Sequence, residues 1–148
     1  MSFDRLEPWM QGLLEQLTAG ERRNAARELA QALRQGQRRR IAAQLNPDGS
    51  PYAPRKPRLR AQAGRIRRSM FAKLRGRYLQ AESDAQGAYI SITGRAARIA
   101  LVHQEGREDA VSPRGPRVRY AQRQILGLSD ADENTVGEIL LAHLARRL

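Results

Sequence analysis

The most informative part of the sequence is RRRIAAQLNPDGSPYAPRKP, residues 38–57. Its Asn46-Pro47-Asp48-Gly49 segment predicts a tight turn, because proline fixes φ, aspartate bonds its own backbone and glycine tolerates positive φ. The prolines that follow remove backbone donors and favour extended geometry, so an exposed, stiff arm is expected over residues 46–58. We expect the arm to contact another protein or subunit. The residues expected at that contact are Pro47, Asp48, Gly49, Pro51, Tyr52, Pro54, Arg55 and Lys56.

Two helices are predicted before the arm. An apolar stripe over residues 3–17 predicts a first helix that begins near Glu7. Thr18 and Glu21 have the spacing of a capping box, which predicts a second helix over residues 19–44. The short connection favours an N-terminal helical hairpin. Trp9 lies beside the first stripe, where it is either an interface anchor or part of the domain's own core.

After the arm the period of the apolar residues changes. Residues 64–76 have helical spacing, whereas residues 78–82 and 88–93 alternate around a turn and predict a β-hairpin. Residues 95–106 read as a short helix, residues 105–117 as a mobile loop and residues 118–126 as a candidate third strand. Ser129 has the position of an N-cap for a closing C-terminal helix. The prediction is one α+β domain over residues 1–148, with a small antiparallel sheet.

The positive charge is local. The chain has a net charge of +12, and residues 34–77 hold fourteen Arg and Lys but a single acid, Asp48. A planar guanidinium suits phosphate, so a polyanion contact is one interpretation, and a solvated cationic face is the other. The helix dipole also favours arginines at positions 38–40. The residues predicted to contact DNA or another polyanion are Arg38, Arg39, Arg40, Arg58, Arg60, Arg65, Arg67 and Arg68.

The sequence contains no recognisable catalytic motif. Cysteine is absent and only two histidines, His103 and His143, are present, each on an apolar side of a predicted helix. Such histidines are more often packed, hydrogen-bonded side chains than catalytic bases or metal ligands. The sequence therefore favours a protein that is not an enzyme, with no cofactor and no metal site. Without an apolar run of about 18 residues or a signal peptide, we expect a protein that is cytosolic where it is made.

Four stretches carry a resemblance to a known family. They are residues 37–56 (QRRRIAAQLNPDGSPYAPRK), 68–75 (RSMFAKLR), 98–106 (RIALVHQEG) and 120–132 (YAQRQILGLSDAD). In order and spacing the chain resembles the phage virion morphogenesis, or tail completion, family of Mu-like and related contractile-tailed phages.

The resemblance implies a structural virion component with no cofactor. It would complete the tail and support head–tail joining at the neck as a homo-oligomeric ring, with six copies expected by analogy with tail symmetry. Its partners would be tail tube or sheath and head-completion proteins, with non-specific contact to genomic DNA, and no membrane. It would be found in the virion and, during assembly, in the host cytoplasm. The alternative is a small basic DNA-binding accessory protein without sequence specificity, which would bind duplex DNA tightly as a monomer.

Overall fold

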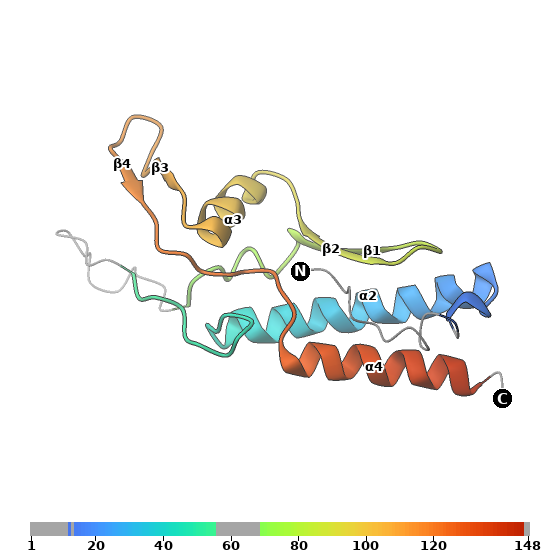
Figure 1. Ribbon diagram of the computed structural model, residues 1–148. Helices are drawn as coiled ribbons and strands as arrows, with labels where there is room; N and C mark the ends of the chain where they lie inside the picture. Colours follow the sequence, from blue (N-terminus) through green and yellow to red (C-terminus); the bar gives the residue numbers. More distant parts are fainter. Residues whose placement is uncertain (1–11, 13, 56–68, 147–148) are drawn as a thin grey trace.

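The computed structural model describes residues 12, 14–55 and 69–146. Residues 12, 14 and 15 are helical, and the rest of the predicted first helix, with Trp9, lies outside the described residues. The chain is α+β, as predicted (Figure 1). Its elements are α2 (Ala19–Ala42), β1 (Leu79–Ser83), β2 (Ala88–Ile92), α3 (Ala96–Glu105), β3 (Glu108–Ala110), β4 (Arg117–Arg119) and α4 (Asp130–Ala145).

Helix α2 is the central element. It begins at the predicted capping box, in which the Glu21 amide donates to Thr18 Oγ1 at 3.1 Å and the Thr18 amide donates to Glu21 Oε2 at 2.9 Å. Helix α4 packs along one side of α2 and runs antiparallel to it, while the β1–β2 hairpin lies along another side (Figure 1). The amphipathic pattern read from the sequence is thus satisfied by two different neighbours.

Two apolar clusters hold these layers together. The first joins α2 to α4 through Leu33, Val136 and Leu140. The second lies where α2, α3 and the connecting segments meet, and its buried members are Ile41, Leu74, Ala96, Ala100 and Ile125.

The β1–β2 hairpin forms as predicted. Leu79 pairs with Ile92 at its open end and Ser83 pairs with Ala88 at its turn. Leu79 is fully buried, and Arg34 of α2 donates to its carbonyl at 2.8 Å. The hairpin is therefore held on α2 by apolar side chains, with Ile90 and Ile92 of β2 packing against the two apolar clusters, and by the Arg34 guanidinium.

The helix predicted over residues 64–76 was wrong for its described part, residues 69–76, which form turns. Phe71 has a φ of 65°, which a regular helix excludes. The Gln44 side chain also forms both backbone hydrogen bonds of Met70. It accepts from the Met70 amide at 2.7 Å and donates to the Met70 carbonyl at 2.9 Å. A side chain from the turn just after α2 thus forms bonds with this backbone that a helix would have formed within itself.

The loop predicted over residues 105–117 was wrong in part, because residues 108–110 form β3 and Arg117 begins β4, while residues 111–116 connect the two strands. Gly106 ends α3 in the left-handed conformation, and Asp109 then pairs with Val118 across a second hairpin. Arg98 of α3 holds this hairpin through an ion pair with Asp109 at 2.5 Å. The strand expected over residues 118–126 is consequently short, ends at Arg119 and does not join the first sheet.

Helix α4 begins at Ser129, as predicted. The Asp132 amide donates to Ser129 Oγ at 3.1 Å, and Asp132 Oδ2 accepts from the Ser129 amide at 3.0 Å. Asp132 is buried and is opposite Gly36 of α2, where a Cβ would collide with Asp132 Oδ1. Glycine at position 36 thus permits the close approach of the two long helices.

Candidate interface: the arm and its arginines

The predicted turn at the start of the arm is present. The Gly49 amide donates to the Asn46 carbonyl at 2.9 Å, and Gly49 has a φ of 88°. Asp48 Oδ1 accepts from the Ser50 amide at 2.8 Å and from its hydroxyl, and these bonds, the hydroxyl first, lower the pKa of Asp48. Asp48 and Gly49 are exposed at the tip of a rigid turn.

Beyond the turn the chain folds back onto its own domain. The Tyr52 amide donates to the Gln44 carbonyl at 2.8 Å, and the Tyr52 side chain is only 5% exposed. Its hydroxyl donates to the Gln124 carbonyl at 3.3 Å. Burial raises the pKa of Tyr52 against the opposing effect of Arg40. Tyr52, predicted at an intermolecular contact, instead belongs to the core, and Pro47 is likewise buried.

Arg123 fixes the end of the described arm. Its guanidinium donates to the carbonyls of Ala53, at 2.7 Å, and Pro54, at 3.0 Å. Arg123 is 5% exposed, and this burial lowers its pKa. The Gln124 amide adds a bond to Asn46 Oδ1 at 2.9 Å. We call this seam between residues 46–55 and residues 120–126 the junction.

Arg40, on α2, binds backbone carbonyls at the junction. It is 8% exposed and donates to the carbonyls of Leu45, Gln124 and Ile125 at 3.0, 3.1 and 2.6 Å, and to Gln37 Oε1 at 2.6 Å. Its guanidinium thus satisfies backbone carbonyls that burial would otherwise leave unpaired. This burial runs against the prediction that Arg40 contacts a polyanion.

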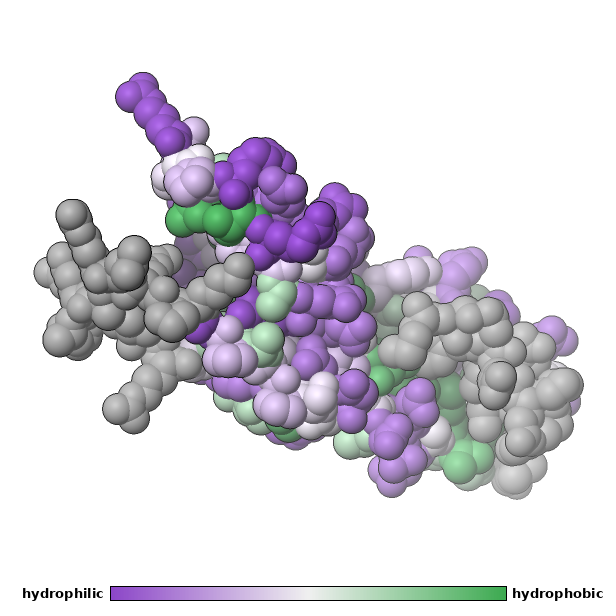
Figure 2. All heavy atoms as spheres, turned by 60° about the vertical axis from the view of Figure 1, so that its left-hand side comes forward, coloured by the Kyte–Doolittle hydropathy of each residue, from purple (hydrophilic) through white to green (hydrophobic). Residues whose placement is uncertain are grey.

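Arg38 and Arg39 are exposed, as a polyanion contact requires. Hydrophilic side chains dominate the described surface on the face that Figure 2 shows, with small hydrophobic patches between them. The other predicted contact residues, Arg58, Arg60, Arg65, Arg67 and Arg68, lie outside the described residues, as does Lys56.

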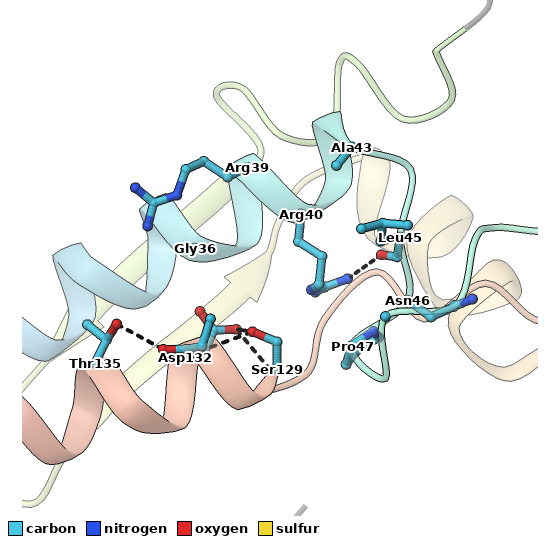
Figure 3. A pocket seen from close by; sticks show the side chains of 12 residues that line it. Gly36, Arg39, Arg40, Ala43, Leu45, Asn46, Pro47, Ser129, Asp132 and Thr135 are labelled. Carbon is cyan, nitrogen blue, oxygen red and sulfur yellow. Dashed lines mark hydrogen bonds between the residues drawn. The ribbon is translucent and has the colours of Figure 1, made fainter.

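A shallow hollow of about 310 Å³ lies between the end of α2, the turn and the start of α4 (Figure 3). Arg39 and Gly36 line it from α2, Pro47 from the turn and Asp132 and Thr135 from α4. The carboxylate of Asp132 is already engaged by Ser129 and by Gln37 at 3.4 Å. These bonds all go to Asp132 Oδ2, so the Asp132 carboxylate in this hollow serves to cap α4 and to hold Gln37.

Both histidines are packed, as predicted. His103 lies in a row of edge-to-face rings, with centroids 4.8 Å from Phe71 and 5.1 Å from Tyr120. Burial, followed by the charges of Arg123 and Arg55, lowers the pKa of His103 to about 4. His143 Nε2 lies 2.6 Å from Glu28 Oε2, which ties α4 to α2. Within the described ranges there is no group of acidic or histidine side chains that could hold a metal ion.

Two comparisons with known proteins find similarity over nearly the whole chain. Residues 1–145 match the model of the phage virion morphogenesis family. The chain belongs to this family. It is 41% identical over 147 residues to Tail completion protein S of Escherichia phage P2, and the match covers 97% of this chain and 98% of that protein. No solved structure matches the chain.

The stretches that carry the family resemblance meet at the junction. Arg40 and Tyr52 come from the first stretch, Phe71 from the second, His103 from the third and Arg123 from the fourth. In this chain, these four stretches therefore hold the domain closed on itself. Among the helices that the structure describes, none is long and apolar enough to cross a membrane.

Three residues that bind the backbone at or beside the junction, Gln37, Gln104 and Arg123, were not predicted from the sequence. Gln104 Oε1 accepts from the amides of Ile125 and Leu126 at 2.8 and 2.9 Å. Gln37 Oε1 likewise accepts from the Gly127 amide at 3.2 Å, whereas Arg123 donates to the Ala53 carbonyl at 2.7 Å. Gln37 carried a readable signal, because it falls on the apolar line of α2 between Leu33 and Ile41, where a glutamine requires buried partners.

Proposed function

We propose that this chain is a structural virion protein that completes the phage tail and supports head–tail joining at the neck. The observation that carries the proposal is the end-to-end identity of 41% with Tail completion protein S. Because the match spans 97% of the chain, it includes all the residues of the junction. Its partners are the tail tube or sheath and the head-completion proteins, which it meets in the host cytoplasm during assembly.

The proposed assembled form is a ring of the chain itself, with six copies. Large exposed apolar side chains occur on α3 and the β3–β4 hairpin (Ile99, Leu101 and Val111), and again on β2 and α4 (Tyr89 and Leu141). Exposed apolar side chains at separate places on the surface suit a head-to-tail contact, which joins two different surfaces and forms a ring when the rotation between copies closes. Six copies of a 16.7 kDa chain should give a native mass of about 100 kDa.

Two exposed features are proposed as contacts between subunits or rings. One is the β3–β4 hairpin, which projects from the body of the domain (Figure 1). The other is the outward side of the arm, where Asp48, Gly49, Pro51, Pro54 and Arg55 are exposed. A segment already held at the junction loses little conformational entropy when it docks.

The test is removal of the gene from a phage that carries it. Electron micrographs of the lysate should then show filled heads and unattached tails, and supply of the wild-type chain from a plasmid should restore joined particles. Normal infectious particles without the chain would overturn the proposal.

A second proposed activity is non-specific contact with DNA. It is favoured by the concentration of basic residues over residues 34–77 and by the exposure of Arg38 and Arg39. Binding of duplex DNA should weaken steeply with salt, because contacts to phosphate release counterions. Absence of any binding at roughly 50 mM salt would remove this activity and leave tail completion standing.

A further inference from the structure

The open end of the β1–β2 hairpin gathers two arginines around one tyrosine. Arg77 Nη2 donates to the Tyr78 hydroxyl oxygen at 2.7 Å, and Arg95 Nε donates to the same oxygen at 3.0 Å. The Arg77 guanidinium carbon also lies 4.8 Å from the centre of the Tyr78 ring. We call these three residues the arginine–tyrosine site.

The backbone builds this site from two distant parts of the sequence. Tyr78 directly precedes β1, and its carbonyl accepts from the Thr93 amide at 2.9 Å, just beyond the end of β2. Gly94, with a φ of 65°, then turns the chain so that Arg95 stands at the start of α3. The Tyr78 ring packs against the apolar cluster around Ile41, which fixes the hydroxyl at the surface. The arrangement therefore belongs to the scaffold of the hairpin.

The charge at this site is uncompensated within the described part of the chain. Neither Arg77 nor Arg95 forms an ion pair there, whereas Arg98, Arg107 and Arg117 each have a carboxylate partner. No Asp or Glu occurs in residues 49–81 or 85–104, which surround the site in the sequence. Two guanidiniums that donate to one neutral oxygen repel each other. An anion bound between them would attract both and make the net electrostatic energy of the site favourable.

The polar atoms that have no hydrogen-bond partner at this site are of the kinds that commonly bind phosphate. Among the described residues, neither terminal nitrogen of Arg95 has a hydrogen-bond partner, and the Tyr78 O–H has no acceptor. The two arginines, Arg95 before Arg77, lower the pKa of Tyr78, so the site already favours negative charge at this oxygen. Guanidinium forks and a hydroxyl donor are common partners of backbone phosphates in protein–DNA contacts.

We propose that Arg77, Tyr78 and Arg95 form a binding site for a phosphate of the DNA backbone. The proposal rests on the proposed contact with DNA and assigns it to a built site at the hairpin, in addition to the exposed arginines of α2. It involves no base contact, so binding through this site is independent of sequence.

The test measures binding of a fluorescently labelled mixed-sequence duplex to the full chain by anisotropy, at several salt concentrations. The variant Arg77→Gln/Arg95→Gln should bind about tenfold more weakly, and its salt slope should be smaller by about 1, as for the loss of one phosphate contact. Tyr78→Phe keeps both charges and should bind a few-fold more weakly. The matched control is Arg22→Gln/Arg23→Gln, which removes two exposed arginines from the start of α2 and should leave the salt slope nearly unchanged.

The possible outcomes distinguish the arginine–tyrosine site, DNA contact in general and tail completion from one another. Equal loss in the two double variants would mean that only net charge matters and would overturn the site, while DNA contact itself would stand. No binding by the wild-type chain would overturn DNA contact and the site together, without bearing on tail completion. Equal weakening of binding to poly-L-glutamate would show an acidic protein segment to be as good an occupant, and would overturn the assignment to DNA. Far-ultraviolet circular dichroism and thermal unfolding establish that each variant is folded.

Discussion

A single guanidinium, that of Arg40, satisfies the backbone where α2, the arm and residues 124–125 meet. Three of its acceptors are main-chain carbonyls that have been removed from water. Arg38, one half-turn away on the same helix, is exposed. Arg38 and Arg40 therefore have different roles, although both belong to the same cluster of arginines. The charge of the cluster does not indicate which arginine is buried and which is exposed.

Replacement of Arg40 by methionine tests this role. The variant Arg40→Met keeps the apolar stem but leaves buried carbonyls unpaired, so the free energy of unfolding should fall by about 2–4 kcal/mol. The same change at exposed Arg38 should alter it by less than about 0.5 kcal/mol. Urea unfolding followed by circular dichroism measures both, and equal stability of the two variants would contradict the assignment.

His103 makes the stability of the junction depend on pH. Its pKa is about 4 in the folded chain and about 6.5 when unfolded, so between these values the unfolded chain binds the extra proton. Stability should therefore fall as pH decreases from about 6.5 to about 4, by about 1 kcal/mol after allowing for the half-exposed ring. Urea unfolding at pH 7 and pH 4.5 should show a larger loss for wild type than for His103→Gln. Parallel losses would mean that His103 does not contribute.

Among the secondary-structure elements, the closest approach is that of α2 to α4 at Gly36. Asp132 caps α4 and fills the space that a side chain at position 36 would occupy. Gly137, on α4, has open space where its Cβ would stand. The two glycines therefore provide a matched pair.

Alanine at these positions should act in opposite directions. Gly137→Ala should stabilise the protein by roughly 0.5–1 kcal/mol through helix propensity. Gly36→Ala has the same intrinsic gain but displaces Asp132 from its capping box, for a net loss of at least about 1 kcal/mol. Thermal unfolding should move in opposite directions for the two variants, and a rise for Gly36→Ala would contradict the packing described.

The β3–β4 hairpin contributes little to either apolar cluster, so it can be shortened without loss of the fold. Replacement of residues 111–116 by Asn-Gly would join Ala110 to Arg117 through a two-residue turn across their existing pairing. The thermal midpoint should change little, whereas native mass should shift from the ring to the monomer if the hairpin contacts a neighbour. A ring of unchanged mass would remove the hairpin from the subunit contact.

At the scale of the whole molecule, the sequence predicted the elements whose signals are local. The capping box at Thr18, the N-cap at Ser129 and the alternation on either side of residues 83–87 predicted two helix starts and a hairpin. The return of Tyr52 into the core was not predictable, because its partners Gln124 and Phe71 are distant in sequence. The turns at residues 69–76 were hidden for the same reason, since Gln44 imposes them from another segment.

The candidate site was predicted less well than the fold. Proline spacing indicated an extended arm, but burial of an arm depends on the surface that receives it, which here is residues 120–126. Charge density likewise indicated a cationic region without separating Arg40, bound inside the junction, from Arg38 and Arg39 outside it. Membership of the virion morphogenesis family, by contrast, was readable from the four stretches that build the junction.

The central claim is that this chain itself completes the tail, and in vitro complementation tests it most directly. Purified wild-type chain is added to a lysate of a phage that lacks the gene, and plaque-forming titre and joined particles are counted with and without it. The account predicts that both rise steeply with added protein, while a buffer control stays at background. Heads and tails that stay separate after addition of the folded protein, in a lysate that an extract of wild-type infected cells does restore, would contradict it.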